Sequence, residues 1–122
     1  MQLDLEKSGG IVIRSFSAGK LHVNDQIIEH HVMLTADEII SEWSPVSIED
    51  LSIADFAPAL ERDPEVILFG TGSTQRFPDT GLITEIMRQG IGFETMDTAA
   101  ACRTFNVLAS EYRRVVAALL LR

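Results

Sequence analysis

The chain has 122 residues and a mass of 13.5 kDa, enough for one domain over residues 1–122 but not for a second core. Its 46% hydrophobic and 23% charged residues are typical of a folded globule and exclude a disordered chain. The formal net charge of −8 disfavours nucleic acid and anionic membrane surfaces, because affinity for a polyanion comes mostly from cations that neutralise it. We therefore expect no nucleic-acid partner.

We expect no targeting signal at the start of the chain. Its first seven residues are acidic and polar, unlike a signal or transit peptide, and we expect residues 1–9 to be a flexible tail. The longest apolar run, 115–121, is far shorter than the roughly 20 residues that span a bilayer. A lone cysteine, Cys102, permits no intramolecular disulfide. We expect a cytoplasmic protein without membrane insertion.

The first third of the chain is rich in β-branched residues and predicts antiparallel hairpins. Turn-forming pairs stand at residues 24–25 and 36–37, and Pro45 ends the pairing. The expected strands cover residues 10–16, 21–23, 26–35 and 38–43.

Strands and helices alternate in the rest of the chain. We expect a short helix over 53–61, strained or ended by Pro58. Residues 65–69 are apolar in succession, which indicates a strand covered on both faces. An amphipathic helix ended by Gly90, a strand over 91–96 and a helix capped by Asp97 or Thr98 follow. This alternation predicts parallel strands with right-handed crossovers, and so an α/β domain with a mixed sheet.

The end of the chain is ambiguous. Residues 115–121 fit either a continuation of the last helix or a strand buried on both faces, and periodicity does not separate the two.

A glycine-containing loop over residues 69–78 leaves the buried strand and leads into a helix. Anions and nucleotides bind at such places in α/β sheets, because backbone N–H groups and the helix dipole converge there. No lysine follows Lys20, which excludes a Walker loop, and Gln75 stands where a dinucleotide fingerprint has its third glycine. Two interpretations stay open: a binding loop, or glycines that only permit a sharp exit from the strand.

The second strand–helix junction should lie beside this loop if the two parallel strands are neighbours. The crevice between segments 70–76 and 97–103 would then offer hydroxyls, an acid and up to two guanidiniums to a small anion. It contains no obvious nucleophile–base pair, so we assign no catalytic residue. The candidate ligand-binding residues are Gly70, Thr71, Gly72, Ser73, Thr74, Arg76, Asp97, Thr98 and Arg103.

Neither a metal nor a cofactor is expected. His30 and His31 are adjacent in a predicted strand, so their side chains point to opposite faces and cannot share one ion. Cys102 lies on the expected core face of its helix, where a buried thiol has a raised pKa and is inert. Arg113 and Arg114 form a local basic spot that we interpret as a solvated strand entry.

Three segments together resemble one family. Residues 66–72 (Val-Ile-Leu-Phe-Gly-Thr-Gly), 90–98 and 101–108, with Trp43 and Leu51, are similar to the adipogenesis-associated Mth-type domain family. That family includes small uncharacterised proteins and a mitochondrial assembly factor for respiratory complex I. The resemblance covers the chain from about residue 10 to residue 121.

The resemblance implies a three-layer α/β fold in which the last segment is a central strand, antiparallel to most of the others. Tyr112 departs from the family pattern, which usually has glycine there. A tyrosine at that position must adopt a left-handed conformation or shift the end of the helix, so this boundary stays open.

The resemblance implies no catalytic residues, and two functional hypotheses stay open. The first is a non-enzymatic protein-binding or assembly factor, monomeric or weakly dimeric, that contacts its partner through an exposed helix face with Arg103, Asn106 and Val107. The second is a small-molecule anion-binding protein, or an enzyme, that uses the crevice described above.

Overall fold

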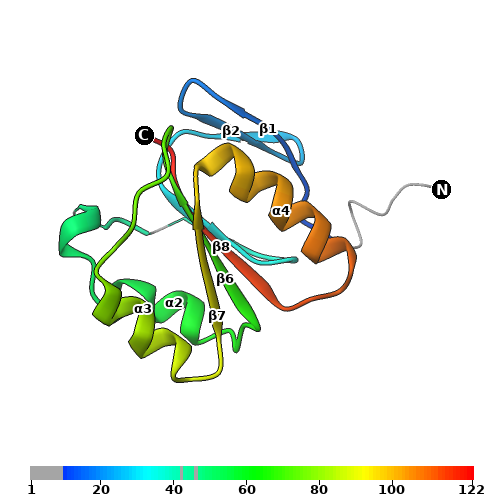
Figure 1. The fold of residues 1–122 in the computed structure, drawn as a ribbon. Helices are drawn as coiled ribbons and strands as arrows, with labels where there is room; N and C mark the ends of the chain where they lie inside the picture. The colour runs from blue at the N-terminus through cyan, green and yellow to red at the C-terminus, as the bar shows by residue number, and fades with distance from the viewer. Residues whose placement is uncertain (1–9, 42, 46) are drawn as a thin grey trace.

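The computed structural model describes residues 10–41, 43–45 and 47–122, and the expected tail, residues 1–9, lies outside that range. A small antiparallel sheet comes first and consists of β1 (Ile13–Ser17), β2 (Lys20–Val23) and β3 (Gln26–Ile28). It lies beside the last helix, α4 (Thr98–Ser110), and away from the other two helices (Figure 1).

The larger sheet is mixed and has the strand order β5-β4-β8-β6-β7. Its strands are β4 (Val32–Leu34), β5 (Ile39–Ile40), β6 (Val66–Thr71), β7 (Gly92–Met96) and β8 (Val115–Leu120). The segment that was ambiguous in the sequence is thus a strand, β8, and it is central as expected.

The direction expected for β8 is wrong. It pairs parallel with β6 and antiparallel with β4, and β6 pairs parallel with β7. The reason is the crossover: the helix that follows β7 carries the chain back along the sheet, so that the next strand starts at the same edge as β7 did.

The expected long strand over 26–35 is two strands in different sheets. β3 continues the small sheet, whereas β4 pairs with β8, and the chain changes sheets between them. The backbone N–H of Leu121 donates to Nδ1 of His31 (3.0 Å), which fastens this crossing point to the end of β8. The strand expected over 38–43 shrinks to the two residues of β5.

Helices cover both faces of the large sheet (Figure 1). They are α2 (Ala57–Leu60) and α3 (Thr80–Met87) on one face and α4 (Thr98–Ser110) on the other. Pro58 stands in the first turn of α2, where its missing N–H is needed by no hydrogen bond, so it begins this helix. Asp79 and Asp97 cap α3 and α4 by accepting from the N–H groups of Gly81 and Ala100.

The core forms two clusters because successive side chains of a buried strand point to opposite faces. In β6, Leu68 packs with the α4 residues Cys102 and Phe105, whereas Ile67 and Phe69 pack with α3 and the segment around Trp43. The second cluster contains a group of aromatic rings with centroids 5.5 to 6.3 Å apart: Trp43, Phe56, Phe69 and Phe93.

Two opposite edges of the sheet matter below. We call the edge where β6, β7 and β8 end the carboxyl pole, formed by residues 70–76 and 97–103. We call the edge where β6 and β8 begin the amino pole, formed by residues 35–38, 62–65 and 109–116. Helix α4 runs from the first to the second. Among the described residues, every helix is too short or too polar to cross a bilayer.

Candidate functional site

The two loops of the carboxyl pole meet as the sequence predicts. β6 and β7 are paired neighbours, with Phe69 opposite Thr95 and Gly70 opposite Met96. The side chain of Gln75 reaches across and donates from Nε2 to the carbonyl of Thr95 at 3.0 Å. The shared rim expected from the sequence is therefore confirmed.

The buried hydroxyls at this rim are used within the fold. Oγ1 of Thr98 accepts from the N–H of Gly72 at 2.8 Å and donates to the carbonyl of Leu120 at 2.6 Å. Oγ1 of Thr71 donates to the carbonyl of Thr74 at 2.6 Å and accepts from the N–H of Arg76 at 3.0 Å. Both threonines are almost fully buried. Their hydroxyls, and the N–H groups of Gly72 and Arg76, already have hydrogen-bond partners within the chain.

The two glycines of the loop permit close contact with the rest of the chain. A Cβ at Gly70 would lie 2.9 Å from Oγ1 of Thr98. Gly72 has a φ of +97°, and a Cβ there would lie 2.9 Å from the carbonyl oxygen of Arg122. Close packing within the chain therefore explains why glycine stands at both positions, without any ligand.

The remaining candidates at this pole are spread over its surface. Ser73 and Thr74 are exposed, and Arg76 pairs with Glu49 at 2.9 Å. Asp97 caps α4, and Arg103 is exposed further along that helix. Anion binding in this crevice stays a prediction.

The exposed face of α4 is less open than the sequence predicts. Val107 is 54% exposed and Arg103 is exposed, as expected. Asn106, however, contacts the small sheet: its Oδ1 accepts from the N–H of Ile13 at 3.0 Å, and its Nδ2 donates to the Ile13 carbonyl at 2.7 Å. Asn106 therefore fastens β1 to α4, and in this structure its amide is engaged with the chain itself.

The thiol is buried as predicted, whereas His30 and His31, expected within one strand, lie between β3 and β4. Burial raises the pKa of Cys102 to about 12, so the thiol stays protonated and unreactive at neutral pH. His31 accepts a backbone hydrogen bond, and burial lowers its pKa. Among the described residues, no group of three acidic, histidine or cysteine side chains has the geometry for a metal ion.

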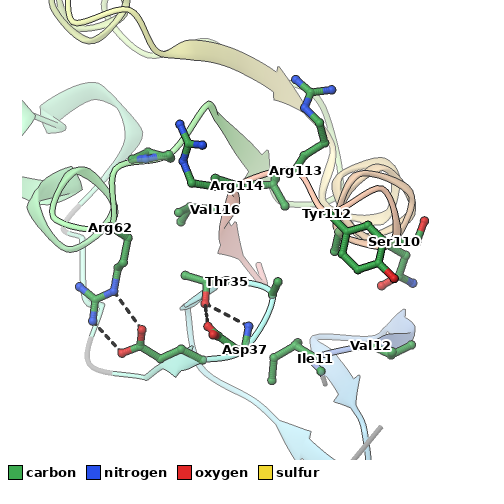
Figure 2. Close-up of a pocket in the computed structure, with 17 residues that line it drawn as sticks. Ile11, Val12, Thr35, Asp37, Arg62, Ser110, Tyr112, Arg113, Arg114 and Val116 are labelled. Carbon is green, nitrogen blue, oxygen red and sulfur yellow. Dashed lines mark hydrogen bonds and ion pairs between the residues drawn. The ribbon is translucent and has the colours of Figure 1, made fainter. Parts of the chain in front are cut away.

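A cavity of about 710 Å³ lies at the amino pole, and it was not predicted from the sequence. Its volume is in the range of ligand-binding pockets, about 300–1,000 Å³. Figure 2 shows the hollow between Thr35 and Val116 on one side and Tyr112 on the other, with Ile11 below. The further apolar lining residues are Val12, Ala36, Pro64, Ala109 and Val115.

Four separate segments bring these residues together. They come from the residues just before β1, the turn between β4 and β5, the segment after α2, and the stretch from α4 into β8. The pair Arg113-Arg114 is the one signal in the sequence that marks this place, and its position at a strand entry is confirmed. No single sequence motif predicts the cavity, because its lining comes from four segments that lie far apart in the sequence.

Three arginines stand at the cavity, and each is matched by an acid. Arg62 binds both carboxylate oxygens of Glu38, at 3.2 and 2.7 Å, and donates a third hydrogen bond to the Pro58 carbonyl. The hydrogen bond from Arg62 lowers the pKa of Glu38. Arg113 donates from Nε to Glu65 at 3.1 Å.

Glu65 also fixes the beginning of β8. Its carboxylate accepts from the backbone N–H of Arg114 at 2.9 Å, and this bond, followed by that from Arg113, lowers its pKa. The guanidinium of Arg114 donates from Nε to the carbonyl of Asp63 at 2.8 Å and lies 3.9 Å from the carboxylate of that residue. The two arginines thus hold the 62–65 segment against the start of β8.

Tyr112 lies in the turn between α4 and β8. The N–H of Tyr112 donates to the carbonyl of Ala109, and the N–H of Arg113 donates to that of Leu108, which is the Schellman pattern of a helix end. In this pattern the residue at the position of Tyr112 is left-handed and usually glycine; here φ is +62°. The helix end that the sequence left open is thus at Ser110, and Tyr112 adopts the costly conformation.

The cavity suits binding better than covalent chemistry. Its described lining offers hydroxyls on Thr35, Ser110 and Tyr112, but no histidine or cysteine beside them. Oγ1 of Thr35 donates to Asp37 at 3.0 Å, and Oγ of Ser110 donates to the Val107 carbonyl at 2.7 Å. Thr35 is buried beside its carboxylate, and the Ser110 hydroxyl bonds to its own helix, so neither hydroxyl is both exposed and paired with a base.

Similar proteins place this geometry in a family. A family model described as "Protein of unknown function (DUF498/DUF598)" matches residues 13–120. The Danio rerio protein named NADH dehydrogenase [ubiquinone] 1 alpha subcomplex assembly factor 3 is 32% identical over 117 residues, which cover 94% of this chain and 67% of the fish protein.

Solved structures agree with the fold. An NMR structure from Xanthomonas campestris has a TM-score of 0.84 at 38% identity and covers 99% of this chain and 92% of its own. An NMR structure from Bordetella pertussis, described as a Mth938-like domain, has a TM-score of 0.75 at 27% identity, with 90% and 85% covered. These findings confirm the resemblance to the Mth-type family. The chain belongs to the family described as "Protein of unknown function (DUF498/DUF598)", whose relatives include a complex I assembly factor.

Proposed function

We propose that this domain is a non-enzymatic assembly factor, which binds another protein while a respiratory complex of the NADH dehydrogenase type is built. The assembly process is taken from the name of the fish relative, and the region similar to this chain covers 67% of that protein's length. The binding role rests on the features of the chain itself.

The observation that carries the proposal is the open cavity at the amino pole. It combines apolar walls with charged side chains at its rim, a mixture that suits a protein contact. Its rim also carries Tyr112, which is 94% exposed. Tyrosine is enriched at protein interfaces because it buries a large rigid ring and keeps a polar end.

Deletion of the gene in the organism that encodes the chain tests the function. We expect a loss of assembled NADH dehydrogenase complex on native gels, restored by the wild-type chain. Val12→Arg, which places a bulky charge at the cavity, should restore little. Val107→Arg adds the same side chain on the exposed face of α4 and should restore assembly.

Two results would contradict the proposal. An unchanged amount of complex after deletion rejects the assembly role. If Val107→Arg fails and Val12→Arg succeeds, with both variants folded by circular dichroism, the contact lies on the face of α4 predicted from Arg103 and Val107. Fractionation and sedimentation in the same strains test the expected cytoplasmic location and the monomeric or weakly dimeric state.

A second candidate function, small-anion binding at the carboxyl pole, is favoured by one observation. A smaller cavity of about 230 Å³ adjoins this pole: Arg76, which pairs with Glu49, lines it with His31 and Arg122, whereas the other candidate residues of the crevice do not line it. Titration with inorganic phosphate tests it by NMR. If the amide signals of Gly70, Gly72 and Thr98 do not move at millimolar phosphate, this function is rejected.

A further inference from the structure

We infer that the cavity at the amino pole binds a basic side chain, a lysine or arginine flanked by apolar residues, on the partner protein. This inference rests on the proposed function and names the chemistry of the partner. It follows from the charges, the helix end and the exposed ring that surround the cavity.

Three arginines and two acids line the cavity, and one acid is unmatched once the pairs with Asp63 and Glu65 outside the lining are included. Arg62, Arg113 and Arg114 are matched by Glu38, Glu65 and Asp63 in turn. Asp37 also lines the cavity, and its carboxylate accepts from Oγ1 of Thr35 but meets no cation among the residues that the structure describes. A positively charged occupant would therefore find an unmatched carboxylate, whereas an anion would meet three guanidiniums that already pair with acids.

The backbone adds to the negative potential. Helix α4 ends at the cavity, and the carbonyl end of a helix carries a partial negative charge of about half a unit. The net charge of −8 for the whole chain acts in the same direction, since it attracts a basic segment from a distance.

Tyr112 supplies the second contact for a cation. Its ring is 94% exposed and stands on the opposite side of the hollow from Thr35 and Asp37 (Figure 2). Lysine and arginine bind over the face of an aromatic ring through its quadrupole. Because the ring buries almost nothing within the chain, while its left-handed backbone costs stability, a contact outside the chain gives this tyrosine a purpose.

Apolar walls account for the flanking residues. Val12 is 38% exposed and Ile11 is partly buried, and both line the cavity with Ala36. Val116 also lines the cavity and is almost fully buried. A basic side chain between aliphatic neighbours therefore matches both the charge and the surface of the site.

Three short peptides test this directly. The probe is N-acetyl-leucyl-lysyl-leucine amide, and its controls carry norleucine or glutamate in place of lysine. We expect the lysine peptide to shift the amide NMR signals of Asp37, Ser110, Tyr112 and Arg114 at millimolar concentration. The norleucine peptide should shift them at severalfold higher concentration, and the glutamate peptide not at all.

Variants of the full chain assign the two contacts. Asp37→Asn should weaken binding of the lysine peptide about threefold to fivefold, since it removes one exposed charge. Tyr112→Gly should weaken it about threefold, the size of an exposed cation–π contact, while Tyr112→Phe should bind as the wild type does. Glu85→Gln makes the same charge change on the exposed surface of α3 and should have no effect.

The inference is overturned if the lysine peptide moves none of these amides, if all three peptides bind equally, or if the glutamate peptide binds best. The same shifts on dilution of the free protein would overturn it too, because a second copy would then occupy the cavity. Gene deletion separates the two proposals. If deletion removes the complex but the lysine peptide does not bind, the assembly role stands and the inference about the basic side chain is rejected. If the lysine peptide binds but deletion leaves the complex unchanged, only the assembly role is rejected.

Discussion

The two poles of the large sheet differ in how the chain uses its polar groups. At the carboxyl pole, Thr71 and Thr98 are buried and both hydroxyls bond to backbone groups from other segments. At the amino pole, a cavity of about 710 Å³ stays open, Asp37 has no cationic partner among the described residues, and Tyr112 is exposed.

This difference shows that position in an α/β sheet does not by itself make a binding site. The carboxyl ends of parallel strands are where such sheets usually bind ligands. Here that place is largely taken by the chain's own contacts, and the end of β8 packs against Gly72. The open surface is at the other end of the sheet, where α4 stops.

The largest expected effect comes from the hydroxyl at the carboxyl pole. Thr98→Val should lower the free energy of unfolding by about 3 kcal/mol, because it leaves the N–H of Gly72 and the carbonyl of Leu120 buried without a partner. Urea denaturation measures this loss. Thr98→Ser keeps the hydroxyl and should lose about 1 kcal/mol, the value of one buried methyl group. Equal losses would show that the hydrogen bonds contribute little.

Gly72→Ala should lower the free energy of unfolding by about 2 kcal/mol and leave binding at the amino pole unchanged. The new Cβ meets the Arg122 carbonyl at 2.9 Å, and the left-handed backbone adds strain. Gly90→Ala is the matched control, because Gly90 has a φ of +83° with nothing within 4 Å and should lose about 1 kcal/mol. A Gly72→Ala loss no larger than the control would disprove the close contact.

At the amino pole we expect a substitution to stabilise the protein instead of destabilising it. Tyr112→Gly should raise the free energy of unfolding by about 1 kcal/mol, because it removes left-handed strain and loses almost no buried surface. Tyr112→Asn should gain less, since asparagine tolerates this conformation better than tyrosine but worse than glycine. Thermal unfolding of the three proteins measures the order. A destabilised glycine variant would mean that the ring packs against the domain.

The smallest effect is a pH dependence at the crossing between the sheets. Burial, helped by Arg122 and His30, lowers the pKa of His31 from 6.5, so the folded state prefers the neutral ring that accepts from Leu121. The unfolded chain then binds more protons as pH falls below 6.5, and this stabilisation is lost between 6.5 and the lower native pKa.

His31→Gln checks that effect, because glutamine does not titrate. Urea midpoints measured on both sides of pH 6.5 should fall more steeply towards acid for the wild type than for the variant. Parallel slopes would show that the ring contributes nothing to the pH dependence.

Much of the fold was predictable because its signals are local. The apolar succession in β6, the stripe of α4 with buried Cys102, and the acid before that helix each report burial or capping within a few residues. The neighbouring exits of β6 and β7 followed from the strand–helix alternation. The Asn106 contact was not predictable, since its partner Ile13 is 93 positions away.

By itself the sequence determined the strands β6 and β7, the helices α3 and α4 and which of their faces are buried, because side-chain periodicity and capping residues act over one or two turns. The tertiary structure alone decided that the 26–35 segment divides between two sheets, that β8 runs parallel to β6, and that the open cavity lies at the amino pole. These features depend on which distant segments pair and in which direction. No periodicity along the chain records that choice.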